Sequence, residues 1–306
     1  MRSQRGSVPA MTTDARADRW LAMMPMVFVL IWSTGFIVAR YGMPHGPPFH
    51  FLAVRFALSV LCFLPWIWLA GSRWPATRVQ WRHLAITGVL MHAGYLGGVW
   101  AAVKAGMGSG VSALVVGLQP VLTAVWVSAM GTRVHVRQWA GLALGLAGLA
   151  LVVSGKFGAG SAQDHVDLWN LAIVGIGLLS ITVGTLYQKR YVAPCDVRTA
   201  NAIQLGAAFL VTAPLALLEN ESMVWNGASV GALAWSVLVL TLGGSSLLYL
   251  LIQRGAATSV TSLLYLVPPT AAVLAWLLFG EPITVFTVLG MAITAVGVGL
   301  VVRQRG

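Results

Sequence analysis

Ten long apolar runs constrain the fold of this chain more than any other feature. They cover residues 21–39, 49–70, 83–101, 107–130, 137–154, 168–188, 199–218, 231–252, 260–279 and 284–302. A helix needs about 20 such residues to cross a bilayer, and continuous runs disfavour the short alternating segments of membrane barrels. Only 9% of the residues are charged, whereas a soluble chain carries about 25%. The sequence therefore predicts an all-α membrane protein with ten transmembrane helices.

The distribution of positive charge predicts the topology. With a cytoplasmic N-terminus, fifteen Lys and Arg residues fall in cytoplasmic segments and three fall outside, while Arg55 lies within a span. The outer three are Arg40, Lys104 and Lys156. Because cytoplasmic loops collect positive charge, both termini are expected in the cytoplasm. The net charge of +11 is then a signal of membrane orientation, and we expect the lipid bilayer and no nucleic acid as a partner.

An internal repeat divides the spans into two sets of five. Shifting the sequence by 149 residues aligns the halves without a gap, and the matched pairs include Gly35 with Gly184, Pro65 with Pro214, Pro120 with Pro269 and Gly141 with Gly290. Because five is odd, the second half is expected upside down relative to the first. The predicted parts are a cytoplasmic tail (1–20), a five-helix repeat (21–154), a linker (155–167), a second repeat (168–302) and a tail (303–306). Inverted repeats are typical of secondary transporters, which bind substrate between the halves.

Matched prolines mark the fourth and ninth spans, at Gln119-Pro120 and Pro268-Pro269. A proline inside a helix removes one backbone hydrogen bond and kinks the helix. The freed carbonyl can face a substrate cavity, or the kink can serve packing alone. Both interpretations stay open at this point.

Arg55 is the one Lys or Arg well inside a span, and no Asp or Glu lies deep in any span. A central arginine costs about 2.5–3.5 kcal/mol to insert. Arg55 is expected either to reach the outer membrane surface as an anchor or to attract an anionic or zwitterionic substrate. His92 lies in the third span and is interpreted as a protonation switch or as a packing residue.

Glycine stripes occur in the fifth and tenth spans, at Gly141, Gly145 and Gly148 and at Gly290, Thr294 and Gly297. Small residues let helices approach closely, so these stripes are expected to pack the two spans together or to form a homodimer seam. The two cysteines, Cys62 and Cys195, are far apart and show no ligand spacing, and no phosphate-binding loop occurs. We therefore expect no catalytic residue, metal or cofactor.

The pattern resembles the EamA family of the drug/metabolite transporter superfamily. The resemblance covers residues 20–302 and is carried by WSTGF at 32–36, FLAVRF at 51–56, Gln119-Pro120, Pro268-Pro269 and Gly280-Glu281. One departure is that the expected Gly-Glu after the fourth span is Gly131-Thr132. The resemblance implies two inverted repeats of five helices in the bacterial inner membrane, and a cavity among spans one, three, four, six, eight and nine.

The expected function is secondary export of a small metabolite, amino acid or drug-like solute by alternating access. Candidate cavity residues are Trp32, Ser33, His92, Tyr95, Gln119, Pro120, Tyr187, Tyr249, Tyr265 and Pro269, with Arg55 as a charge or anchor site. One alternative is a membrane-embedded enzyme acting on a lipid-linked substrate, which would need paired titratable groups on facing helices. Another is a scaffold without a continuous polar cavity.

Overall fold

The computed structural model describes residues 15–129, 136–156, 165–247 and 266–302. The described α-helices are α1 (Ala15–Gly42), α2 (Pro48–Leu69), α3 (Arg78–Gly88), α4 (Tyr95–Lys104), α5 (Ser109–Val116), α6 (Gln119–Ala129), α7 (Val136–Lys156), α8 (Leu168–Tyr191), α9 (Val197–Leu217), α10 (Gly227–Ala234), α13 (Val267–Phe279) and α14 (Val285–Val302). A short 3-10 helix, η1 (Met43–His45), follows α1. Two π-helical segments, η2 (Val89–Gly94) and η3 (Trp235–Gly244), continue α3 and α10.

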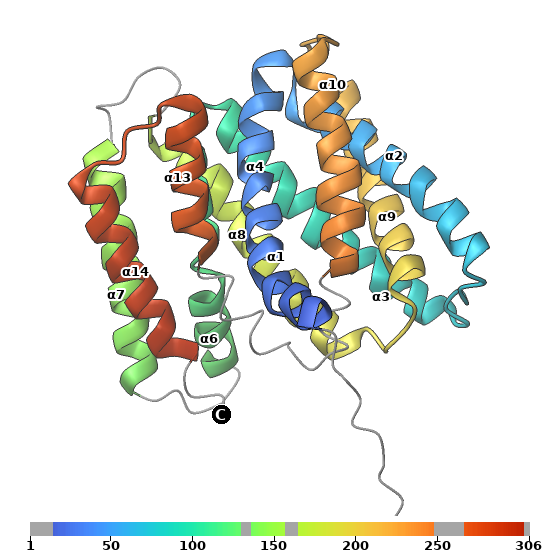
Figure 1. The fold of residues 1–306 in the computed structure, drawn as a ribbon, viewed down its shortest axis with the longest axis horizontal. Coiled ribbons are helices and arrows are strands. Elements are labelled where there is room, and N and C mark those ends of the chain that lie inside the picture. Colours follow the sequence, from blue (N-terminus) through green and yellow to red (C-terminus); the bar gives the residue numbers. More distant parts are fainter. Residues whose placement is uncertain (1–14, 130–135, 157–164, 248–265, 303–306) are drawn as a thin grey trace, which may run out of the picture.

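The number of spans agrees with the sequence prediction. Among the described residues, eight helices are long and apolar enough to cross a membrane, and two shorter apolar ones follow at Val267–Phe279 and Val285–Leu300. Four of the eight spans combine several elements: α1 continues into η1, α3 into η2 and α4, α5 into α6, and α10 into η3. The fold is an all-α bundle of ten membrane helices in two repeats (Figure 1).

The packing of α7 against α14 shows that the repeats are inverted. A Cβ atom on Gly148 would lie 2.5 Å from the Gly290 carbonyl oxygen, and one on Gly297 would lie 2.5 Å from the Gly141 carbonyl oxygen. Early residues of one helix thus meet late residues of the other, so the two helices are antiparallel neighbours (Figure 1). They are the fifth spans of their repeats, and the expected role of the glycine stripes in packing these two spans is confirmed.

The same contacts obey the repeat offset of 149 residues. The repeat equivalent of Gly141 is Gly290, and that of Gly297 is Gly148. The contact between Gly141 and Gly297 is therefore equivalent to the contact between Gly290 and Gly148. A second pair behaves alike, since Gly35 faces Leu240 in η3 and Gly184 faces Met91 in η2. Equivalent residues therefore make equivalent contacts across the interface, as a two-fold relation between the halves requires.

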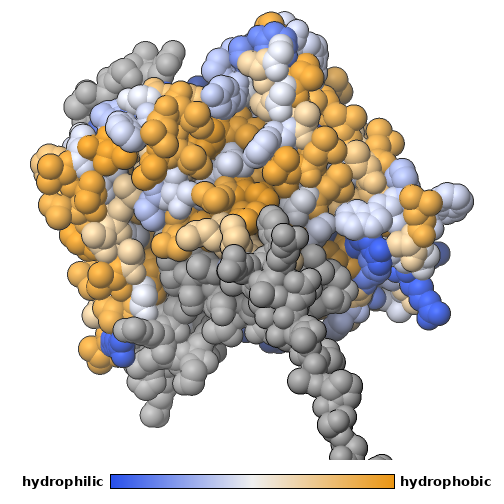
Figure 2. Space-filling model, in the orientation of Figure 1, coloured by the Kyte–Doolittle hydropathy of each residue, from blue (hydrophilic) through white to orange (hydrophobic). Residues whose placement is uncertain are grey.

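The surface fits a bilayer. Figure 2 shows hydrophobic side chains over most of the visible face, while hydrophilic ones gather near the top of α10 and near the start of α3. In Figure 1, α1 begins and α14 ends at the lower end of the bundle, so the described ends of the chain lie on one side. From the distribution of Lys and Arg, we expect this lower end to face the cytoplasm. The upper end carries η1 and the loop between α13 and α14.

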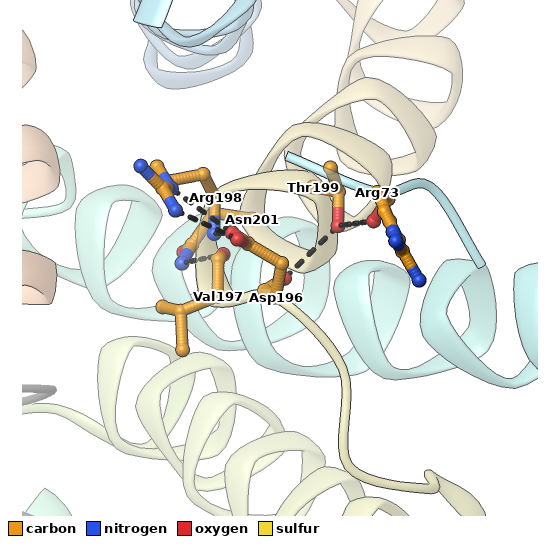
Figure 3. A network of polar contacts seen from close by, with 6 residues as sticks. All are labelled: Arg73, Asp196, Val197, Arg198, Thr199 and Asn201. Atoms are coloured by element: carbon orange, nitrogen blue, oxygen red, sulfur yellow. Dashed lines mark hydrogen bonds and ion pairs between the residues drawn. The ribbon is translucent and has the colours of Figure 1, made fainter. Parts of the chain in front are cut away.

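An ionic cap begins α9 at the lower end (Figure 3). The Asp196 carboxylate accepts from the backbone N–H of Arg198 at 2.9 Å and pairs with its guanidinium at 2.8 and 3.0 Å. Thr199 Oγ1 donates to the carbonyl oxygens of Asp196 and of Arg73, in the loop before α3. The network fixes the position where the seventh span starts against the loop between the second and third.

This cap predicts a pH-dependent contribution to stability. The Arg198 guanidinium holds the pKa of Asp196 below its usual range. A lowered carboxyl pKa stabilises the fold above the unfolded-state value, about 3.9, and the contribution disappears as the pH falls through the folded-state value. We expect Asp196→Asn to lower the free energy of unfolding by about 1 kcal/mol or less at pH 7. Melting temperatures of the two proteins should converge below pH 4; a constant difference would contradict this explanation.

Candidate functional site

Two π-helical segments lie at equivalent places in the two repeats. The offset of 149 carries η2 (Val89–Gly94) onto residues 238–243, which lie inside η3 (Trp235–Gly244). A π-helix has poorer backbone geometry than an α-helix and occurs often at functional sites. Both copies retain this feature in the middle of a long span. The centre of the third and eighth spans is therefore a candidate region for a functional site.

Polar contacts cross between the repeats at these segments. Arg55 Nη2 on α2 donates to Thr241 Oγ1 in η3 at 3.4 Å, and the Gln204 side chain on α9 lies close enough to His92 in η2 to interact with its imidazole. Gln204 is the repeat equivalent of Arg55, and Thr241 is the equivalent of His92. The two contacts therefore join equivalent positions, with the roles of the two halves exchanged. We call Arg55, His92, Gln204 and Thr241 the crossed polar pairs.

Arg55 points into the protein. Its residue is 7% exposed, its guanidinium carbon lies 6.0 Å from the centre of the Trp100 ring, and Tyr95 and His92 are close enough to interact with its charge. The guanidinium is directed toward Thr241 in η3 and is buried inside the bundle. Tyr95 is itself 8% exposed. Arg55, His92 and Tyr95 are therefore brought together.

The fourth span is broken where the sequence predicts a proline kink. The helix α5 stops at Val116 and α6 restarts at Gln119, so Pro120 occupies the second position of a new helix, where its missing N–H costs little. Pro268 and Pro269 are the second and third residues of α13, again in the first turn of a helix. A Cβ atom on Gly117 would lie 3.0 Å from Pro268 Cγ. The break before α6 therefore lies beside the start of α13, at the interface between the repeats.

Further candidates link the two halves near this meeting point. Gln119 Nε2 donates to Thr185 Oγ1 on α8 at 2.9 Å. The buried Ser33 on α1 donates to its own helix at Val29 and, at 3.5 Å, to the carbonyl oxygen of Val267 on α13. Trp32 packs on Phe28 with ring centres 5.3 Å apart. The structure thus places Ser33 and Gln119 at contacts between the repeats, as a substrate site between the halves would require.

The tyrosine candidates separate into two groups. The Tyr187 hydroxyl bonds His83 Nδ1 at 2.7 Å, and Tyr191 stacks on the same imidazole, at the lower ends of α8 and α3. Tyr187 therefore joins the sixth span to the third near the lower surface. Tyr249 and Tyr265 lie outside the described residues.

Three glutamates of the second repeat hold the upper end together. Glu281 is buried, accepts from the backbone N–H of Ser109 at 3.0 Å, and lies 3.6 Å from the Arg40 guanidinium. Glu219 accepts from two backbone N–H groups at the start of α2 at 2.8 and 3.0 Å. Glu221 pairs with Lys104 at 2.7 Å. Every one of these contacts reaches the first repeat, and we call the three residues the upper glutamates.

Sequence reasoning missed Gln204, Thr241 and the upper glutamates as parts of one interface. The repeat offset already contained the signal for the first two, because adding 149 to Arg55 and His92 gives their numbers. The glutamates gave no such signal, since their repeat equivalents are Ala70, Ser72 and Thr132. Their partners became visible only when the loops at the upper end came together.

Comparisons with known proteins agree with this architecture. Residues 19–154 and 168–303 each match the family described as the EamA-like transporter family. The uncharacterized inner membrane transporter YedA of Escherichia coli K12 is 28% identical over 275 residues, covering 89% of this chain and 87% of YedA. A probable amino-acid metabolite efflux pump of Salmonella typhimurium is 23% identical, covering 92% and 94% of the two chains. A crystal structure with 17% identity and a TM-score of 0.62 covers 92% of this chain and 96% of that one, and supports the fold.

Proposed function

The chain belongs to the EamA-like transporter family, and from this premise we propose that it exports a small organic solute across the bacterial inner membrane by alternating access. The observation that carries the proposal is the pair of equivalent contacts that each half makes with the other at the centre of the bundle. Because the two repeats are similar and have opposite orientations in the membrane, each repeat can adopt the conformation that the other had. A site between them then opens first to one side and then to the other.

The broken fourth span supports the same proposal. Secondary transporters commonly interrupt membrane helices at the repeat interface, where the free backbone groups meet solute or ions. Gly117, in the break before α6, lies against Pro268 near the start of α13, and Ser33 and Gln119 add side-chain groups. The name of the Salmonella relative makes amino acids and their derivatives the first solutes to test. The sequence has no phosphate-binding loop, so the proposed energy source is a solute or proton gradient.

The direct test is counterflow in proteoliposomes that contain only the purified protein. Vesicles are loaded with a mixture of unlabelled amino acids and small organic acids, and entry of each labelled solute is followed. We expect transient accumulation of at least one solute above equilibrium, with a rate that saturates. Entry equal to that in protein-free vesicles for every solute would contradict the proposal. Release of a chemically altered product would instead favour an enzyme.

Gln119→Ala is expected to reduce this flux. Removing the amide breaks the bond to Thr185 between the fourth and sixth spans, which both contributes to the proposed site and joins the repeats. We expect the rate to fall about tenfold, equivalent to about 1.4 kcal/mol, at matched protein amounts. Ser154→Ala is the control, because the Ser154 side chain is exposed and bonds only its own helix at Leu151. Equal flux in the wild type and Gln119→Ala would remove Gln119 from the site.

A further inference from the structure

In the described part of the chain, no carboxylate lies within ion-pair distance of Arg55. All eight acidic residues of the sequence lie outside the ten apolar runs: Asp14, Asp18, Asp164, Asp167, Asp196, Glu219, Glu221 and Glu281. Arg55 is the eighth residue of α2, roughly 10 Å along the helix from its upper start. Buried charges in proteins are normally paired. A negatively charged group from outside the polypeptide would supply such a partner.

Hydrogen-bond donors around Arg55 are also left over. Among the described residues, Arg55 Nε, Ser59 Oγ and Ser236 Oγ are buried and have no hydrogen-bond partner. Ser59 lies one turn beyond Arg55 on α2, and Ser236 lies in η3, where its carbonyl accepts from Thr241. Within the described ranges, the guanidinium bonds Thr241 at 3.4 Å, which is long. Arg55 Nε–H is thus left without an acceptor, and the two serine hydroxyls, which can donate or accept, are left without partners, so a bound anion would satisfy the guanidinium.

The repeat shows that the fold itself does not need a charge here. At the equivalent place in the second half, Gln204 makes the equivalent contact to His92 with a neutral amide. A neutral side chain of similar reach is therefore sufficient to join α9 to η2. The guanidinium of Arg55 is an addition made in one copy only. A purely structural role would leave this difference between the copies unexplained.

We infer that Arg55 binds a carboxylate group of the transported solute, in a site completed by the crossed polar pairs and the Trp100 face. This inference rests on the proposed transport function and specifies its substrate class. A guanidinium presents parallel N–H groups that match the two oxygens of a carboxylate. A single negative charge neutralises the single charge of Arg55, whereas a phosphate dianion would leave excess negative charge in a buried site. The aromatic ring of Trp100 provides an apolar wall beside the charged group.

The first test measures the stability of Arg55→Gln without solute. This variant places in α2 the residue that α9 carries at the same repeat position, so it is expected to fold. An uncompensated buried charge is removed, and the melting temperature in detergent should stay equal or rise. Arg78→Gln is the matched control, because Arg78 lies exposed at the start of α3. A clear fall in melting temperature for Arg55→Gln alone would make the arginine structural and overturn the inference.

The second test compares three solute pools in the counterflow assay with wild type, Arg55→Gln and Arg78→Gln. One pool holds amino acids and organic acids, the second holds carboxamides and other uncharged solutes, and the third is inorganic phosphate. We expect only the carboxylate pool to move, and we expect Arg55→Gln to lose at least about tenfold of that flux while Arg78→Gln keeps it. Flux of the uncharged pool or of phosphate instead, or equal carboxylate flux in Arg55→Gln, would overturn the inference and leave transport standing. No flux from any pool in the wild type would contradict the proposed function itself, and with it this inference.

Discussion

Gly297→Leu is expected to disrupt the fold more severely than any other single change considered for this chain. A Cβ atom at this position would lie 2.5 Å from the Gly141 carbonyl oxygen and 2.6 Å from the Gly145 backbone nitrogen. The obstructing atoms belong to the backbone of α7, so they cannot move aside as a side chain can. Overpacking usually costs about 1–3 kcal/mol, and backbone contacts on this scale should raise the cost to about 3 kcal/mol or more. Thermal unfolding of the purified protein in detergent measures the effect.

The control for this change lies two residues away on the same helix. A Cβ atom on Gly299 would meet nothing within 4 Å, and leucine has a better helix propensity than glycine by about 1 kcal/mol. Gly299→Leu should therefore leave the melting temperature unchanged or raise it. If both variants lost the same stability, close packing of α7 against α14 would not explain the loss. The contact between these helices, which supports the inverted arrangement, would then be contradicted.

Glu281→Ala is expected to produce the second largest loss. The carboxylate is 5% exposed, caps the first N–H groups of α5 and lies beside Arg40. Gly280 directs it there, because its φ of 66° turns the chain back at the end of α13. Its removal leaves the N–H groups at the buried start of α5 without their acceptor and breaks the ion pair with Arg40. Breaking a buried ion pair costs about 3–5 kcal/mol, which corresponds to a fall in melting temperature of roughly 10 °C.

Glu221→Ala is the comparison for Glu281→Ala. Glu221 makes a shorter ion pair, with Lys104 at 2.7 Å, but its side chain is half exposed. Exposed pairs contribute about 0–1 kcal/mol, so the melting temperature should change by no more than a few degrees. A larger loss from Glu221 than from Glu281 would show that burial does not determine the importance of the upper glutamates.

The architecture could be predicted from the sequence because it depends on patterns that the chain repeats. Long apolar runs determine the spans, and an odd number of spans in each copy determines the inversion. The contacts Gly148–Gly290 and Gly141–Gly297 agree with both, because antiparallel fifth spans arise only from inverted copies. The proline of the fourth span was located correctly as an irregular point. The sequence predicted a kink in the fourth span, whereas the structure has a break there between the separate helices α5 and α6.

The candidate site was less predictable, since it depends on which side chains meet across the bundle. Arg55 was expected either at the outer surface or at a substrate, and sequence position alone could not decide between them. Its direction depends on the place of η3 beside α2, which determines that Thr241 lies within reach. The π-helical segments were also invisible, because no residue pattern distinguishes them from an ordinary apolar helix. Loop contacts such as Glu219 with the start of α2 likewise follow from tertiary packing.

The central claim is that a site between the two halves opens to both sides of the membrane, and single-cysteine accessibility tests it most directly. Thr185→Cys lies at the contact between α8 and Gln119 and would be made in a background with Cys62 and Cys195 replaced by serine. A membrane-impermeant thiol reagent is added to right-side-out vesicles and, separately, to inside-out vesicles. Alternating access predicts modification of this cysteine from both faces, slowed by a transported solute. Modification from one face only, with or without solute, would contradict it.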